Sequence, residues 1–169
     1  QMGYCVLEDG RLGASIGRDG SSVMLVIDVE SWDPSSNQPA STVEFTSENG
    51  LPMQFGSLTA GTNGNVYFMG GDPSTPTSVY RWNMQEKKDC EILKSSAKNE
   101  FGTSVISVPR RVEFPTTLGT AFGYYYPPKN GDYQCTTETA PPLLVKAHGG
   151  PTAATGTSFN AGIQYWTSR

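Results

Sequence analysis

The first 96 residues carry the hydrophobic pattern of short β-strands and no helical period. Apolar and β-branched runs of strand length alternate with Asp-Gly, Asn-Gly and Gly-Gly pairs, which favour tight turns. Strands are expected at residues 4–7, 12–16, 23–29, 43–46, 55–60, 66–69, 78–82 and 90–93. The predicted fold class is therefore mainly β.

The expected strands form two sets of four that resemble each other. Each set has a turn glycine, a strand, a polar loop, an apolar strand that ends in polar residues (VMLVIDVES and VYRWNMQEK) and a shorter strand (TVEFT and CEILK). The sets repeat at a spacing of about 50 residues, which is near the length of a four-stranded propeller blade. We predict two β-propeller blades. Two blades cannot close a ring, so further blades are expected outside this sequence.

After residue 96 the pattern changes. Residues 98–107 are mixed and polar, and we expect a connection there. Residues 112–114 and 121–126 then predict a hairpin that turns around Gly119.

A strand, a glycine loop and a helix are expected near the end of the sequence. The apolar run LLVKA at 143–147 predicts a buried strand, and it leads directly into the glycine loop. Thr157 or Ser158 can cap the helix, whose apolar face would hold Phe159, Ile163 and Trp166. This is half of a βαβ unit, and it needs further strands to pair with.

The glycine loop His148-Gly149-Gly150-Pro151 carries the chemistry. In α/β-hydrolases, the loop after the third strand supplies a backbone N–H to the oxyanion hole, commonly through a His-Gly-Gly sequence. Glycines allow the backbone to approach a substrate carbonyl closely. We expect Gly149 and Gly150 to form the oxyanion hole and His148 and Pro151 to support the loop. The alternative is a tight turn without chemistry.

Two other features of the sequence could suggest catalytic residues, but neither fits the α/β-hydrolase pattern. His148 is the only histidine in the sequence, but α/β-hydrolase triads run Ser, then acid, then His, with the His far beyond this loop. The run Gly13-Ala14-Ser15-Ile16-Gly17 matches the nucleophile-elbow pattern, yet it reads as a strand rather than a strand-to-helix turn, so we interpret it as a chance match. No member of a triad is expected, and neither a metal nor a cofactor is expected.

The composition of the sequence argues against two classes of binding partner, nucleic acids and membranes. The net charge of -4 argues against nucleic acid, and no apolar run is long enough for a membrane span. The three cysteines are scattered and odd in number, which favours a reducing compartment. We expect an intracellular protein, cytoplasmic or plastid, although no targeting segment is visible.

The run from Arg111 to Arg169, with VEFPT, YYYPP, PPLLVKAHGGP and IQYWTSR, resembles the start of the catalytic domain in the prolyl oligopeptidase family. The likeness is to its acylaminoacyl-peptidase and dipeptidyl-aminopeptidase-like branch, including plant forms. In that family a β-propeller precedes the hydrolase domain. The resemblance implies that 1–106 are the C-terminal blades of a propeller and that 107–169 are the first strands, oxyanion loop and first helix of an α/β-hydrolase domain.

The resemblance also implies a function. The parent protein would be a serine peptidase that hydrolyses peptides through an acyl-enzyme, and this chain would contribute the oxyanion loop but no catalytic triad. The partners would be a peptide substrate and the remainder of the same polypeptide, and the chain alone would be inactive. The alternative is a non-catalytic β-propeller-type interaction module.

Overall fold

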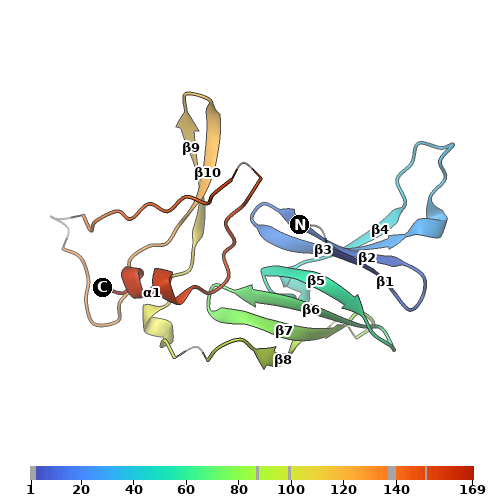
Figure 1. Ribbon diagram of the computed structural model, residues 1–169, viewed down its shortest axis with the longest axis horizontal. Coiled ribbons are helices and arrows are strands. Elements are labelled where there is room, and N and C mark those ends of the chain that lie inside the picture. The colour runs from blue at the N-terminus through green and yellow to red at the C-terminus, as the bar shows by residue number, and fades with distance from the viewer. Residues whose placement is uncertain (1–2, 87, 99, 137–139, 151) are drawn as a thin grey trace.

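The computed structural model describes residues 3–86, 88–98, 100–136, 140–150 and 152–169 (Figure 1). Antiparallel strands dominate these ranges, and one short α-helix lies near the end. The strands are β1 Gly3–Val6, β2 Leu12–Arg18, β3 Ser21–Asp28, β4 Ser41–Phe45, β5 Gln54–Ala60, β6 Asn65–Asp72, β7 Thr75–Asn83, β8 Glu91–Ser95, β9 Arg110–Thr116 and β10 Gly119–Tyr125. The helix α1 is Ala161–Thr167, and 3-10 turns lie at Val29–Ser31, Ser47–Asn49 and Thr103–Val105.

The first eight strands form two four-stranded antiparallel sheets. The N-terminal sheet has the order β1-β2-β3-β4, and the second sheet has the order β5-β6-β7-β8. Each strand pairs with its neighbour in the sequence, and the predicted sets of four are confirmed. The β2–β3 turn agrees with the Asp-Gly signal in the sequence. Asp19 and Gly20 both have positive φ, 50° and 84°, as a two-residue hairpin turn requires.

The hydrophobic core lies between the two sheets. The N-terminal sheet contributes Met24, Val26 and Phe45. The second sheet contributes a row of aromatic side chains: Phe55, Phe68, Tyr80 and Trp82. The Phe45 ring packs edge-on against the Trp82 ring with centroids 4.9 Å apart, so aromatic side chains from both sheets are in direct contact in the core.

Hydrogen bonds join the two sheets at one end. The Ser22 hydroxyl donates to the carbonyl of Phe55 (3.0 Å) and accepts from the Phe55 amide (2.9 Å), while the Ser22 amide donates to the carbonyl of Met53 (2.7 Å). The Gln54 side chain donates to the carbonyl of Gly20 at 2.6 Å. The packing of the two sheets is thus fixed by polar contacts as well as by the core.

The outer face of the N-terminal sheet is largely apolar. Residues paired across strands share a face, and the register places Tyr4 beside Ala14 and Leu25, and Val6 beside Leu12 and Ile27. Tyr4 is 71% exposed and Val6 is 66% exposed. The outer faces of both sheets also carry a cross-strand ion pair, Arg18 with Glu44 in the N-terminal sheet and Arg81 with Glu91 in the second sheet. The exposed apolar face of the N-terminal sheet is typical of a surface that packs against protein.

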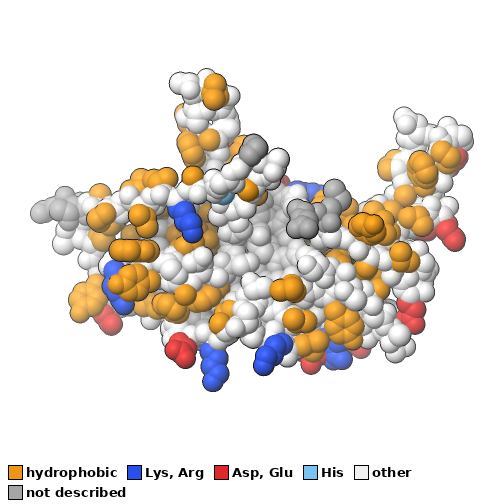
Figure 2. Space-filling model, viewed as in Figure 1, with side chains coloured by type: hydrophobic (Ala, Val, Ile, Leu, Met, Phe, Trp, Pro, Cys, Tyr) orange, Lys and Arg blue, Asp and Glu red, His pale blue; other side chains and the backbone are white. Residues whose placement is uncertain are grey.

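The expected hairpin is confirmed as β9 and β10, which project away from the two sheets (Figure 1). It contacts the N-terminal sheet at the β2–β3 turn. There Arg111 forms an ion pair with Asp19 at 2.9 Å, and a Cβ at Gly20 would overlap the Tyr124 hydroxyl. Several side chains of the hairpin are apolar and exposed: Val112, Phe114, Leu118, Phe122 and Tyr125. Figure 2 shows hydrophobic side chains on the hairpin among other atoms.

The strand expected at 143–147 is wrong for this structure. These residues have no regular secondary structure, and Leu143, Leu144 and Val145 are 70–79% exposed. A strand exists only through hydrogen bonds to a neighbouring strand, and no strand of the described chain lies in register with this segment. The apolar run was identified correctly, but no strand among the described residues pairs with it.

The helix is confirmed, but its cap and its buried face differ from the prediction. Asn160, rather than Thr157 or Ser158, caps α1, with its side-chain oxygen accepting from the Ile163 amide. Trp166 is 63% exposed, whereas Gln164 is the buried residue of the helix. The apolar spacing gave the wrong face because Gln164 is buried against the chain, whereas Trp166 is left exposed and of the expected apolar residues Phe159 packs against Phe101.

The cysteines should differ strongly in reactivity. Burial, with smaller contributions from Asp89 and Asp72, raises the pKa of Cys90 to about 12, and burial also raises the pKa of Cys5, whereas Cys135 is exposed. We expect iodoacetamide at pH 8 to modify Cys135 first and Cys90 about 10²- to 10³-fold more slowly, because the thiolate is the reactive form. Peptide mass mapping over time measures this, and equal rates in the folded protein would contradict it.

Candidate functional site

The glycine loop forms an exposed turn after the apolar run 143–147. Gly150 has a φ of 77°, in the left-handed region that favours glycine, and nothing lies within 4 Å of a Cβ built on Gly149 or Gly150. In the view of Figure 1 the turn projects between the hairpin and the N-terminal sheet. The loop therefore needs glycine at 150 for its backbone conformation and not for lack of space.

The amide groups of the loop are available to a ligand. Within the described residues, neither the Gly149 N–H nor the Gly150 N–H donates to a protein acceptor. Both residues are exposed, so water satisfies these groups in the free protein. Two consecutive free amides at a glycine turn are the kind of donor that an oxyanion hole uses.

His148 and Pro151 were expected to support the glycine loop, and the structure shows one contact for His148. The His148 ring is exposed, and its Nδ1 lies 3.4 Å from the carbonyl of Gly149, its immediate neighbour. This contact stays within the loop and does not link it to either sheet. Pro151 lies outside the described residues.

The loop is anchored on its C-terminal side. A Cβ on Gly156 would approach the Gln54 side-chain oxygen at 2.9 Å, and the Phe159 amide donates to the carbonyl of Asp72 at 2.8 Å. The Phe159 ring meets the Phe101 ring edge-on with centroids 5.8 Å apart. These contacts tie the segment after the loop to the second sheet and to the connection before β9.

A buried polar contact that the sequence pattern missed holds α1. Gln164 Oε1 accepts from the Ser107 amide at 2.7 Å, and Gln164 Nε2 donates to the carbonyl of Ser107 at 3.1 Å. A glutamine in an amphipathic helix reads as a solvent-facing residue, so no signal in the sequence pointed to this contact. It joins the helix after the loop to the segment between β8 and β9.

Ser15 is not placed as a nucleophile. It lies in the middle of β2 and is buried, and its hydroxyl lies 3.4 Å from the carbonyl of Gly3 on the adjacent strand. A nucleophile elbow needs a sharp turn between a strand and a helix. The interpretation of GASIG as a chance match is confirmed.

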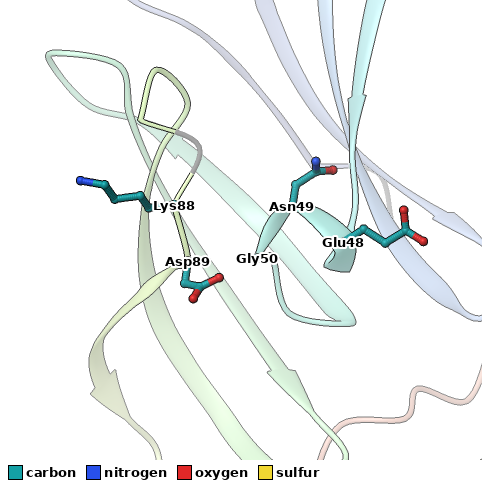
Figure 3. A pocket seen from close by; sticks show the side chains of 5 residues that line it. All are labelled: Glu48, Asn49, Gly50, Lys88 and Asp89. Carbon is teal, nitrogen blue, oxygen red and sulfur yellow. The ribbon is translucent and has the colours of Figure 1, made fainter.

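Another surface depression is lined by polar and ionisable side chains. It is lined by Glu48, Asn49, Gly50, Lys88 and Asp89 (Figure 3). It is open to solvent, and the Lys88 and Glu48 side chains point away from each other. Gly50 is required there because its φ is 81° and a Cβ would meet the Asp89 backbone. The depression is a packing feature of the 3-10 turn Ser47–Asn49 against the residues before β8.

The chain resembles solved structures of puromycin-hydrolysing enzymes. The chain is similar to a puromycin-hydrolysing peptidase of Mycobacterium tuberculosis, with 26% identity over 98% of this chain and a TM-score of 0.75. It is also similar in fold to puromycin hydrolase, alone and as a Ser-to-Ala mutant complexed with PGG, with 19% identity and TM-scores of 0.76. These neighbours are peptidases of the prolyl oligopeptidase family. The resemblance found in the sequence is thereby confirmed.

The chain spans 23% of the length of these prolyl oligopeptidase-family structures. No family model matches the sequence, and no curated protein matches it. The likeness therefore rests on the fold and on the identity to the mycobacterial enzyme.

Among the residues that the structure places, no group of three or more His, Cys, Asp or Glu side chains could hold a metal ion. No helix within the described ranges is long and apolar enough to cross a membrane.

Proposed function

We propose that this chain is a section of a serine peptidase that hydrolyses peptides through an acyl-enzyme. It contributes the oxyanion loop, with Gly149 and Gly150 as donors, and no member of the catalytic triad. One observation supports the proposal most strongly. Gly150 is exposed with a left-handed backbone conformation in a turn whose amide groups are not bonded to protein, and the chain resembles the structure of a peptidase. The nucleophile, acid and base would come from other parts of the parent protein.

The role of the loop follows from the chemistry of acyl transfer. When a serine attacks the scissile carbonyl, negative charge develops on the carbonyl oxygen. A fixed backbone N–H near 3 Å from that oxygen stabilises the charge without reorganisation. Such a donor stabilises only an intermediate that a nucleophile has formed, so the chain by itself would not hydrolyse peptides.

The two sheets are proposed to be propeller blades. Their equal strand order, their face-to-face packing and the exposed apolar outer face of the N-terminal sheet support this assignment. In a propeller, that face would pack against the preceding blade. Residues 1–106 would then be the end of the propeller, and 107–169 the start of the α/β-hydrolase domain.

Two assays of the full-length gene product that contains this chain test the proposal. We expect a fluorophosphonate probe to label one serine outside this chain, and we expect hydrolysis of puromycin or an aminoacyl anilide. The 169-residue chain alone is the control and should remain unlabelled. Absence of labelling and hydrolysis in the full-length protein would favour the non-catalytic interaction module, and labelling of Ser15 would contradict the assigned roles.

A further inference from the structure

Gln164 makes a hydrogen-bond pair that is entirely enclosed by protein. Its residue is 1% exposed, and its partner Ser107 is 0% exposed. The carboxamide accepts from the Ser107 N–H (2.7 Å) and donates to the Ser107 carbonyl (3.1 Å), as a neighbouring strand would. A buried amide that loses such partners retains its full desolvation cost, so this contact is sensitive to small changes.

The same contact is the centre of a larger junction. The Ser107 hydroxyl donates to the carbonyl of Pro127 at 2.5 Å, and the Lys129 amide donates to the carbonyl of Thr167 at 2.7 Å. The Asn130 side chain donates to the carbonyl of Ser168 at 2.7 Å. Three segments meet here: the connection before β9, the chain after β10, and α1.

The glycine loop is linked to this junction through the segment that leads into α1. In the described ranges, no hydrogen bond ties residues 140–147 to the rest of the protein. On its C-terminal side the loop continues into residues 152–160, where the Phe159 amide donates to the carbonyl of Asp72 and Asn160 caps the helix that Gln164 fixes.

We propose that Gln164 is a positioning residue for the amides of Gly149 and Gly150, acting through α1 and residues 156–160. This inference rests on the proposed function, because it assigns Gln164 a role in the same reaction. Gln164 does not touch the substrate. It fixes where the donors lie when the oxyanion forms.

The side chain must both accept and donate, which gives a specific test by substitution. In Gln164→Glu, a protonated acid retains both hydrogen bonds to Ser107, whereas a carboxylate would face the Ser107 carbonyl. Burial and the lost donor disfavour the charged form, so the folded pKa of this acid lies above the unfolded value of about 4.3. The stability that it contributes is present at low pH and is lost as the pH rises through the folded pKa.

The experiment compares Q164E with Q38E in the full-length gene product. Gln38 is exposed, so Q38E is the same chemical change without the buried contact. Both proteins are purified at pH 5.5, and kcat, KM and Tm are measured from pH 5 to pH 8 with an aminoacyl anilide. We expect the ratio of kcat for Q164E to that for Q38E to fall by about 10- to 100-fold across this range, with KM within about twofold.

The readouts separate the possible failures. If the Tm of Q164E falls with pH while the kcat ratio stays constant, Gln164 is structural only and the positioning role is overturned. Failure of Q164E to fold at pH 5.5 would also overturn it, since the protonated acid retains both bonds. If the wild-type protein hydrolyses nothing, the proposed function fails and the positioning role with it, while the Tm comparison still tests the contact itself.

Discussion

Replacing Gly150 by proline is expected to lower kcat of the full-length gene product by about 10²- to 10³-fold or more. Proline removes the N–H that is proposed to face the oxyanion, and its fixed φ near -65° is incompatible with the φ of 77° found at this position. Steady-state kinetics with an aminoacyl anilide measures the change. KM should change less, because the donor acts mainly in the transition state.

Three variants separate loss of the donor from other effects. Gly149→Ala adds a Cβ in open space at a residue without positive φ, so kcat should stay near the wild-type value. Gly150→Ala keeps the N–H and adds only backbone strain of roughly 1–2 kcal/mol, so its loss should be intermediate. His148→Ala should be milder than loss of a catalytic base. A proline variant with unchanged kcat, or an inactive His148→Ala, would contradict the assigned roles.

Replacing Trp82 by alanine is expected to destabilise the packed sheets by about 3–5 kcal/mol. Trp82 is 1% exposed, packs against Phe45, and its Nε1 donates to the carbonyl of Lys88 at 3.0 Å. The change therefore leaves a cavity and an unpaired carbonyl. Amide hydrogen exchange in β6 and β7 of the full-length protein should speed up by about 10²- to 10³-fold.

The matched control is Trp32→Ala. Trp32 is 60% exposed in the loop between β3 and β4, so its removal should change stability by less than about 0.5 kcal/mol. Equal effects of the two substitutions would show that the core does not lie between the two sheets.

The strands of the two sheets could be predicted because their signals are local. Alternation of apolar residues and Asp-Gly or Asn-Gly turns need only neighbours in the sequence, and both Asp19-Gly20 and Asn63-Gly64 adopt the positive φ values that such pairs favour. The hairpin around Gly119 was predicted on the same grounds. The hydrophobic pattern could not show which faces of the two sheets pack together, because Trp82 and Phe45 belong to different sheets.

The prediction failed where structure depends on partners distant in sequence. Residues 143–147 have the composition of a buried strand, but their state depends on a strand to pair with. The helix face was misassigned because Gln164 is buried by contact with Ser107, 57 residues away. At the candidate site, the glycines were identified from spacing and turn chemistry, whereas the junction that anchors them came only from the structure.

The central claim is that the amides of Gly149 and Gly150 bind the oxyanion of an acyl-transfer reaction. A structure of the full-length gene product with a peptide boronic acid bound to the nucleophile would test it most directly. The account predicts that the nitrogen of Gly149 or Gly150 lies about 3 Å from a boronate oxygen. A boronate held by other donors, with the glycine loop turned towards solvent, would contradict it.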